Sequence, residues 1–261
     1  MFRDQDVNIY NHGQRDYNIT YKYNMLDLAF LNFSGRNYLV DLTARYELYH
    51  FNNLLSGNGP IDVRLGNQHY VSYHFKIHFN SQNREYFTSS GARFETEYGL
   101  YTDNFVKYND HNPFSVVSAR WQIAFRLNNR LVLQPMVYGR VVWGDDIPLC
   151  QFNVVGSEMF GHYFSQQMPF SGINNVEYVE NAFVGCQFQL QQRIMDNNYL
   201  AFAMSLGEAN DKLKDIFQSK LMHGYRFTYS YDSFFGPLGA TIGYSSRTKK
   251  AYLYINLGYE F

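Results

Sequence analysis

Hydrophobic and polar residues alternate with a period of two along most of this chain. The C-terminal stretch shows the alternation most clearly, because one face of an extended strand there would carry mainly apolar side chains: Ala251, Leu253, Ile255, Leu257, Tyr259 and Phe261. Successive side chains of a strand point to opposite faces, and the other face here is mixed in polarity. A final strand that is apolar on one side and ends on an aromatic residue is typical of a transmembrane β-barrel, with lipid outside and a polar lumen inside.

The same alternation returns upstream in stretches separated by turn-forming residues. These stretches lie at 7–10, 19–24, 40–48, 73–79, 93–100, 117–126, 131–143, 184–191, 199–206, 225–232 and 238–245. With the last one they predict about 12 strands, most of them near the roughly 9–11 residues that a tilted spanning strand needs. We therefore predict an all-β, antiparallel transmembrane β-barrel that is closed, with both chain ends on one side of the membrane.

The connections between these stretches alternate in length. Short turns are predicted at 34–37, 128–130, 196–198 and 233–237, and longer loops at 52–67, 102–113, 145–175 and 208–222. Short periplasmic turns and long external loops are characteristic of outer-membrane barrels. Two connections depart from this rule, since 80–90 is long for a periplasmic turn and 247–250 is short for an external loop.

Charged residues in the predicted strands are concentrated on the face opposite the aromatic residues. The predicted lumen therefore contains Arg45, Glu47, Lys76, Glu95, Glu97, Arg120, Arg126, Arg140 and Arg226. A charge that faces lipid at the bilayer midplane costs about 2–4 kcal/mol, so this sorting favours a membrane barrel. By the same rule Ile19, Tyr21 and Tyr23 are predicted to face lipid. A soluble β-sandwich or lipocalin-like barrel would alternate equally well, but with its apolar face inward.

Composition agrees with the membrane barrel. Aromatic residues form 19% of the 261 residues, which girdles at two membrane interfaces would explain. The net charge of −1 gives no indication of a nucleic-acid partner. Cys150 and Cys186 could pair in an oxidising compartment, but Cys186 falls on the lipid-facing side, which favours a free thiol. The N-terminal residues do not form a signal peptide, so we expect a mature or excised part of a longer protein.

The segment Tyr229–Phe261 resembles the last strand pair of the BamA-like superfamily of outer-membrane barrels. The shared parts are the Gly236-Pro237 turn, the following strand rich in small residues and the closing aromatic strand. The segment is most similar to the barrel attached to patatin-like phospholipases in Bacteroidetes. The resemblance implies that the barrel-assembly machinery recognises the closing strand through its lipid-facing side, in a contact of the β-augmentation type. The residues of this assembly signal would be Leu253, Ile255, Leu257, Tyr259 and Phe261.

The segment Gly156–Gly172 resembles the long sixth external loop of the same superfamily, which folds back into the lumen. The residues that carry this resemblance are Gly156, Gly161, Gln167, Pro169, Phe170 and Gly172. Many members carry an Arg-Gly-Phe/Tyr tip that pairs with lumen acids, whereas this chain has Phe160-Gly161-His162-Tyr163. Five predicted strands follow the loop, as in the superfamily, whose barrels usually have about 16 strands.

Three groups of side chains are candidates for chemistry. His74 and His78 share an inward face and could bind a metal, but Lys76 between them favours lumen lining. His50 lies at the height where a barrel phospholipase needs its histidine, although no lipid-facing serine is clearly placed beside it. Loop residues could hold divalent cations that bridge lipopolysaccharide, or be solvated charges. These are Asp103, Asp110, His111, Asp145 and Asp146.

The patatin nucleophile elbow, G-x-S-x-G, is not found in the sequence. We therefore expect one non-catalytic, cofactor-free barrel domain over residues 1–261, in the bacterial outer membrane, that anchors or translocates a patatin-like protein in the manner of type V secretion. Its weak edge would be the seam between the first and last strands. The alternatives are a free-standing channel and, less favoured, a lipid-modifying barrel enzyme. Expected partners are outer-membrane lipids and lipopolysaccharide, the barrel-assembly machinery, and a second copy or a fused patatin/POTRA region.

Overall fold

A computed structural model describes residues 2–55, 67–156, 164 and 166–258. They form a 15-stranded sheet in which twelve strands are long and three are short. The long strands are β1 (Phe2–Asn11), β2 (Gln14–Ser34), β3 (Tyr38–Leu55), β4 (Asn67–Asn80), β5 (Gly91–Thr102), β6 (Phe114–Arg126), β7 (Leu131–Trp143), β11 (Ala182–Met195), β12 (Asn198–Asn210), β13 (Met222–Ser233), β14 (Gly236–Ser245) and β15 (Ala251–Leu257). Neighbouring long strands pair antiparallel, so the all-β prediction of about 12 spanning strands is confirmed.

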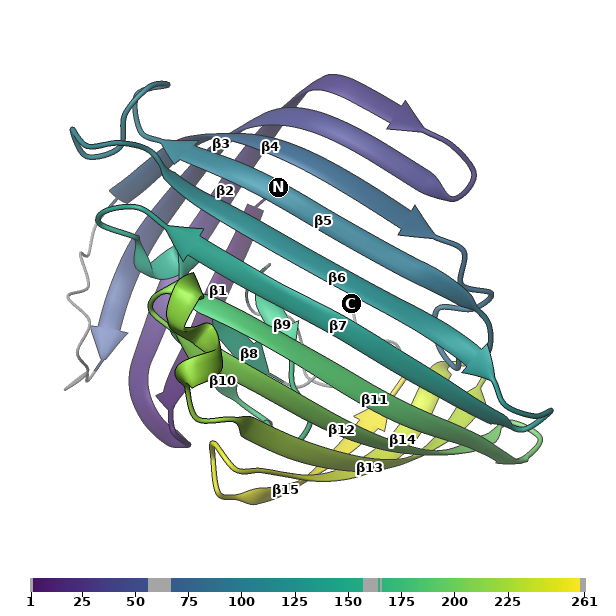
Figure 1. The fold of residues 1–261 in the computed structure, drawn as a ribbon. Coiled ribbons are helices and arrows are strands. Elements are labelled where there is room, and N and C mark those ends of the chain that lie inside the picture. Colours follow the sequence, from purple (N-terminus) through teal and green to yellow (C-terminus); the bar gives the residue numbers. More distant parts are fainter. Residues whose placement is uncertain (1, 56–66, 157–163, 165, 259–261) are drawn as a thin grey trace.

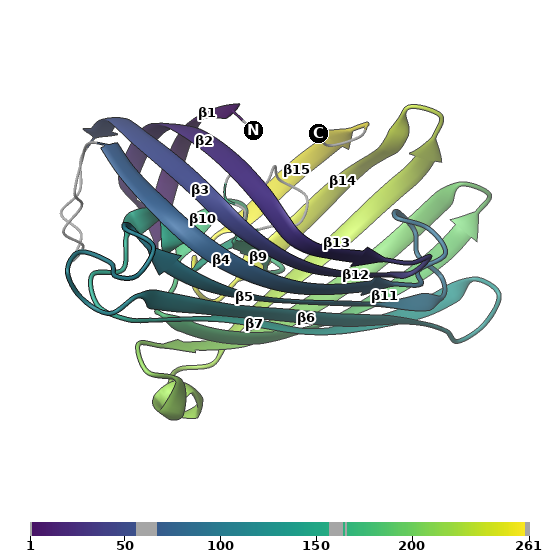
Figure 2. The ribbon, with the colours of Figure 1, turned by 90° about the horizontal axis from the view of Figure 1, so that it is seen from above.

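The long strands curl around a common axis and give the sheet an outer and an inner face (Figure 1, Figure 2). Large apolar side chains are exposed on the outer face, among them Phe75, Trp121, Phe188 and Phe227. Eight of the nine predicted lumen charges line two cavities on the inner face, and the ninth, Arg126, donates a hydrogen bond to Ser89 Oγ at 2.8 Å. The predicted sorting of charges is therefore confirmed.

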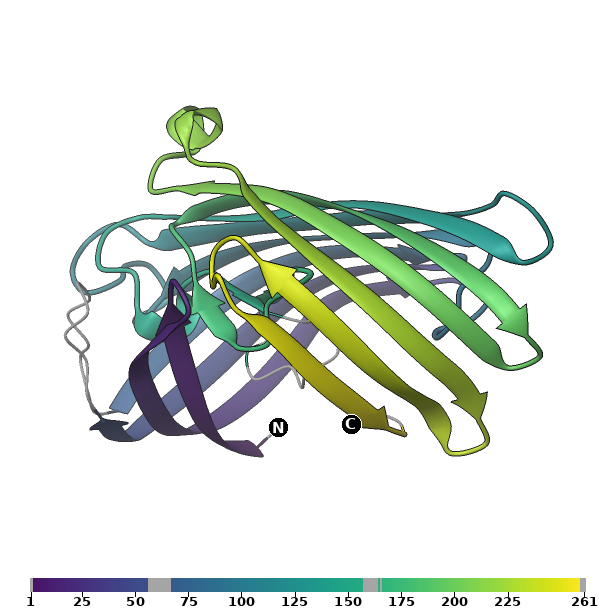
Figure 3. The ribbon, with the colours of Figure 1, turned by 90° about the horizontal axis from the view of Figure 1, so that it is seen from below.

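The connections also follow the predicted alternation. The short β2–β3, β6–β7, β11–β12 and β13–β14 turns lie at one end, here called the turn end, together with the longer β4–β5 connection. The β5–β6, β7–β11 and β12–β13 loops lie at the opposite end, here called the loop end. The start of β1 and the end of β15 lie close together, so both termini are on one side (Figure 3).

The predicted closure of the barrel is not seen. Among the described residues β1 and β15 share no ladder, and the sheet order begins at β15 and continues past β1 to the short strands. The physical reason lies at the free edge of β1, where Ile9 and Tyr10 pair in parallel with Val176 and Glu177 of β10 (Val176–Tyr178). We call the interval between β1 and β15 the seam.

The predicted face of β2 is wrong. Ile19 and Tyr21 are almost fully buried and face inward, in a cluster that also contains Val7, Tyr49 and Phe164. At the loop end the interior is filled with protein rather than water, so inward apolar side chains are buried there as they would be in a soluble core. Period-two alternation gives the two faces of a strand but not which one is inside.

Helical structure is confined to two 3₁₀ turns in loops, η1 (Leu149–Gln151) and η2 (Leu213–Gln218), within the described residues. None of the described helices has the length and hydrophobicity that crossing a bilayer would require.

Candidate functional site

In the connection between β7 and β11, residues 144–181, the described parts 144–156, 164 and 166–181 fold into the interior of the curled sheet (Figure 2). We call it the lumen segment. It contains the short strands β8 (Val154–Gly156), β9 (Gln167–Pro169) and β10. β8 pairs with β9 in parallel and with β10 antiparallel, and β10 joins the edge of β1. The lumen segment therefore adds three strands to the free edge of β1 while filling the space enclosed by the wall.

The stretch Phe170-Ser171-Gly172 presses against the inner wall of β11 to β14. Ser171 N donates to Ser205 Oγ at 3.0 Å, and Ser171 Oγ donates to Gln187 Oε1 at 3.2 Å. Gly172 has φ +85°, and a Cβ at this position would overlap Tyr244 O. Likewise a Cβ on Gly224 of β13 would overlap Ser171 O. Glycine is needed at both positions because backbone passes directly over backbone.

Arg140 of β7 holds the other side of the lumen segment. This buried guanidinium donates to Gln151 O at 2.8 Å, to Gln151 Oε1 at 3.0 Å and to Asn153 Oδ1 at 2.5 Å. Asn153 in turn donates through Nδ2 to Glu180 O and Asn181 O at 2.9 and 2.8 Å. In the described residues the arginine therefore belongs to the wall and the acceptors to the loop.

The structure brings most of the predicted loop residues together. Gly156 O accepts a hydrogen bond from Phe170 N at 2.7 Å, while Gln167 and Pro169 form β9 beside it. Gly161 lies outside the described residues. On the closing strand Leu253, Ile255 and Leu257 are exposed on the outer face, while Tyr259 and Phe261 also lie outside the described residues.

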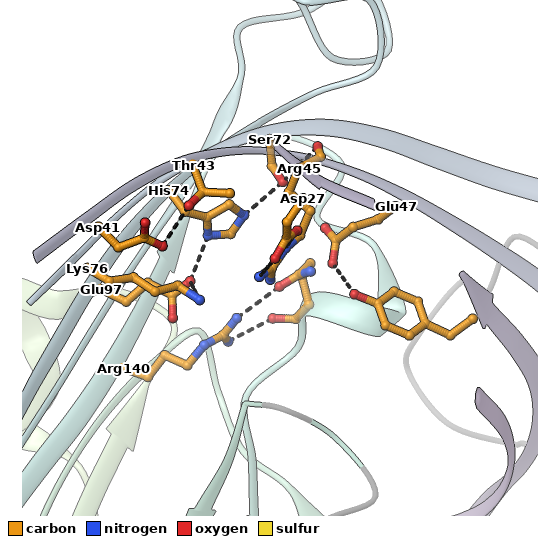
Figure 4. A network of polar contacts seen from close by, with 12 residues as sticks. Asp27, Asp41, Thr43, Arg45, Glu47, Ser72, His74, Lys76, Glu97 and Arg140 are labelled. Carbon is orange, nitrogen blue, oxygen red and sulfur yellow. Dashed lines mark hydrogen bonds and ion pairs between the residues drawn. The ribbon is translucent and has the colours of Figure 1, made fainter. Parts of the chain in front are cut away.

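The charged residues of the inner face form ion pairs with one another (Figure 4). Arg45 binds Asp27 through two hydrogen bonds of 2.7 and 2.9 Å, and Lys76 lies 3.3 Å from Glu97. Glu95 accepts from Arg93 at 2.7 Å. The Tyr23 hydroxyl donates a hydrogen bond to Glu47 at 2.8 Å, and His78 Nδ1 lies 2.9 Å from Glu95 Oε1. Arg93 and Glu95 share β5, whereas Arg45–Asp27 and Lys76–Glu97 join adjacent strands and help to hold them in register.

Ser72, His74 and Glu97 form a constellation that sequence reasoning missed. His74 Nε2 lies 2.8 Å from Ser72 Oγ and its Nδ1 lies 2.6 Å from Glu97 Oε1 (Figure 4). Nucleophilic hydrolases use this order of nucleophile, base and acid. Here Ser72 and His74 are 0% and 1% exposed, and neither lines the cavity that Glu97 lines. A substrate cannot reach Ser72 Oγ, so these contacts connect β4 to β5 rather than catalyse a reaction.

The remaining candidates for chemistry have structural contacts. No cluster of metal-ligating side chains occurs in the part of the chain that the structure describes. His50 Nδ1 contacts the amide oxygen of Asn67, which is not a nucleophile. Asp103 and Asp146 accept hydrogen bonds from Asn109 and so connect two loops. Cys150 and Cys186 are both free.

Two cavities remain between the lumen segment and the turn end, and Arg93 and Arg120 line both. The first, of about 500 Å³, lies against Gln166 to Pro169. The second, of about 330 Å³, is lined by five glutamines of the long strands: Gln122, Gln134, Gln187, Gln189 and Gln191. Gln82 and residues 85–88 of the β4–β5 connection also line the second cavity.

That connection, residues 81–90, covers the turn end, and we call it the turn-end cover. Phe87 stacks on Tyr199 of β12 with ring centroids 4.2 Å apart, and Thr88 O accepts from Gln134 of β7 at 2.8 Å. Arg84 lies 3.3 Å from Asp232 of β13. The cover therefore reaches from the β4–β5 edge to strands on the other side of the sheet, so the inner space is obstructed at both ends.

A known fold has this arrangement of a curled antiparallel sheet with an inserted loop. The structure of BamA from Haemophilus ducreyi lacking POTRA domains 1-3 matches with a TM-score of 0.67 at 14% identity, over 98% of this chain and 56% of that one. This chain thus spans little more than half the length of that protein. Comparison with curated protein sequences found no match. The family model described as the OMP85 superfamily matches residues 11–261, nearly the whole chain, and this chain therefore belongs to the OMP85 superfamily of bacterial outer-membrane barrels.

Proposed function

We propose that this barrel is a non-catalytic anchor and translocation domain, which holds or passes a polypeptide at the seam. The observation that supports the proposal is that the first and last long strands are not paired with each other in the part of the chain that the structure describes. β1 and β15 share no ladder among the described residues, while β10 of the lumen segment occupies part of the edge of β1. Unpaired strand edges are templates for another polypeptide, so the seam is the place where a client segment would bind.

The obstructed lumen favours this function over a free-standing channel. The lumen segment fills the loop end, the turn-end cover spans the turn end, and the charges between them are largely paired. Because short turns face the periplasm and long loops face outward, the turn end is the periplasmic end. Among the described residues, chain therefore covers part of both ends, which opposes the passage of small solutes.

The experiment compares conductance with translocation. The purified barrel in a planar lipid bilayer should show little steady current. In cells, the chain carrying a leader peptide and an upstream reporter domain should insert into the outer membrane and bring the reporter to the cell surface. A large, steady conductance together with a reporter that stays in the periplasm would refute the proposal in favour of a channel.

The passenger we propose is a patatin-like enzyme domain, in a member of the Bacteroidetes. The support is the similarity of Tyr229–Phe261 and Gly156–Gly172 to barrels of that kind. A reading frame upstream of Met1 that encodes a G-x-S-x-G elbow and a POTRA region would agree with this proposal. A signal peptide directly before Met1 would contradict it and would leave a free-standing barrel.

The lipid face of the closing strand supports a third element of the proposal, namely recognition by the barrel-assembly machinery. Leu253, Ile255 and Leu257 project outward and are 60–79% exposed, as a β-augmentation contact followed by insertion into lipid requires. Substituting these three residues by serine should slow membrane insertion in cells. Substituting the inward Tyr252 and Tyr254 by serine is the matched control.

A further inference from the structure

A pocket of about 610 Å³ opens at the loop end, beside the seam. We call it the rim pocket. Three connections border it: the β1–β2 turn at His12 and Gly13, the β14–β15 turn at 246–250, and the end of the β12–β13 loop at 220–222. The first and last hairpins of the barrel therefore form opposite walls of one pocket.

The rim pocket is strongly basic. Lys220, Arg247, Lys249 and Lys250 line it, and Glu180 is the one acid among the described residues that do. This differs from the lumen, where charges of both signs lie side by side. Lys220 and Lys249 are exposed, and neither takes part in an ion pair within the described residues. Such an excess of unpaired cations attracts an anion.

The backbone holds the pocket in a fixed shape. His12 and Lys249 have φ of 52° and 53°, a region that residues other than glycine rarely adopt. Lys250 Nζ donates to Gly13 O at 2.8 Å, and a Cβ on Gly13 would lie 2.7 Å from Thr248 O. The two turns are thus in direct contact, and their donors are arranged before any ligand arrives. Burial, aided by Arg247, lowers the pKa of His12, so its ring adds no positive charge to the pocket near pH 7, and its Nδ1 lies 2.7 Å from Asn11 Oδ1.

An apolar element lies next to the pocket in the β12–β13 loop. η2 projects away from the strands at the same end as the β14–β15 turn (Figure 3). Its Leu213 and Phe217 are 54% and 82% exposed, and Leu221, which lines the pocket, is 48% exposed. Apolar side chains flanked by lysines are typical of segments that lie in a membrane interface.

We infer that the rim pocket binds the phosphate groups of a phosphorylated saccharide headgroup, carried by a glycolipid of the outer leaflet, while η2 contacts the acyl chains. Lysines bind phosphate as point charges, and the volume of about 610 Å³ has room for a headgroup larger than a single ion. The inference rests on the outer-membrane location of the barrel and not on its translocation role. A bound phosphate would bridge the first and last hairpins, and so it would hold the loop end of the seam together.

The test titrates three probes into the folded full chain in detergent, by calorimetry: diphosphorylated lipid A, its dephosphorylated form, and inorganic pyrophosphate. The variant is Lys220→Ala/Lys249→Ala, and the matched control is Arg36→Ala/Lys107→Ala, which removes the same charge from exposed positions outside both the pocket and η2. At about tenfold per 1.4 kcal/mol and about 1 kcal/mol per lysine near an anionic surface, the variant should bind diphosphorylated lipid A about 30-fold more weakly.

Binding that needs both the phosphates and the acyl chains, and that weakens only in the pocket variant, supports the inference. Equal weakening in the two variants would show general charge attraction and overturn it. Pyrophosphate binding as tightly as lipid A would overturn the assignment to a lipid. Heat-modifiable migration on a gel reports folding of each variant, and Lys249→Gln alone repeats the test with a substitution that keeps the length of the side chain.

Discussion

At the residue scale, the contact between Gly224 and the lumen segment depends on the absence of a side chain. A Cβ there would overlap Ser171 O, which is backbone and cannot rotate away. Gly224→Ala should therefore displace the lumen segment and lower the free energy of unfolding by about 1–3 kcal/mol, the usual cost of overpacking. Urea unfolding in detergent gives the stability, and limited proteolysis of 144–181 reports the displacement.

Gly243→Ala is the matched control on the neighbouring strand. A Cβ at Gly243 would meet the ring atoms Cε1 and Cζ of Tyr252 at 2.5 and 2.7 Å, and a side chain can turn aside where backbone cannot. This variant should keep the lumen segment resistant to protease. If Gly224→Ala were equally resistant and equally stable, the close approach of Ser171 would be wrong.

Glu177 is the residue whose charge state matters most for the seam. Its carboxylate is fully buried, accepts a hydrogen bond from Gly13 N at 3.0 Å and lies 3.7 Å from Arg247 Nε. Burial raises the pKa of Glu177 above its ordinary value of 4.5, and Arg247 opposes the shift without cancelling it. The folded protein therefore holds this proton more tightly than the unfolded chain does.

The pH dependence follows from that difference. The stabilisation from protonated Glu177 is fully present below pH 4.5 and is lost as the pH rises through the raised pKa of the folded state. Glu177→Gln keeps an acceptor for Gly13 N and does not titrate, so its free energy of unfolding relative to the natural chain should increase as the pH rises through this window. Denaturation at several pH values measures the difference, and a constant difference would mean that Glu177 does not titrate there.

At the element scale, the turn-end cover is held across the interior by few contacts, of which the Phe87–Tyr199 stack is the tightest ring contact. Phe87→Ala should release the cover and lower stability by about 0.5–1.5 kcal/mol, the value of such an aromatic pair. Steady conductance through a planar bilayer should rise if the cover obstructs the periplasmic end.

Phe105→Ala provides the control for that experiment. Phe105 also has a positive φ, 73°, but lies in a loop at the opposite end with its ring 68% exposed. The same chemical change at the same backbone conformation should leave conductance unaltered. Equal conductance of the two variants would show that the cover does not restrict passage.

The strands and their inward faces could be predicted from the sequence wherever a single physical rule determines which face points inward. The strands from β3 onward follow from alternation, because lipid outside and ion pairs inside both penalise a reversed face. The faces of β1 and β2 were not predictable, since Ile19 and Tyr21 are buried by the lumen segment, far along the chain. The unusual length of the connection 80–90 was visible in the sequence, but its contacts were not. It contacts Tyr199 and Asp232, and the alternation of polar and apolar residues does not show that their strands lie across the interior from it.

At the scale of the whole molecule, the sequence predicted a weak seam between the first and last strands but not the loop that enters it. Closure was expected because an unpaired edge in a membrane is costly. In the structure, the lumen segment replaces part of that pairing: β10 joins β1, and Arg247 of the β14–β15 turn reaches both Glu177 and Tyr178 O. A loop inserted between two strand edges produces no periodic pattern in the sequence. Its contacts depend on where the loop lies in three dimensions and not on residue spacing along the chain.

These contacts predict that the loop end of the seam opens as a unit when the Arg247–Glu177 pair is broken. Arg247→Met leaves the buried Glu177 carboxylate without its cation, so the free energy of unfolding should fall by about 3–5 kcal/mol. In a Glu177→Gln background the same change should cost less, because no buried charge is left behind. The coupling energy of the double-mutant cycle should be about 0.5–3 kcal/mol. Amide hydrogen exchange should accelerate at Ile9, Tyr10 and 251–257 in Arg247→Met alone, while β5 to β7 stay protected. Uniform acceleration across all strands would mean that the pair supports the barrel as a whole rather than its seam.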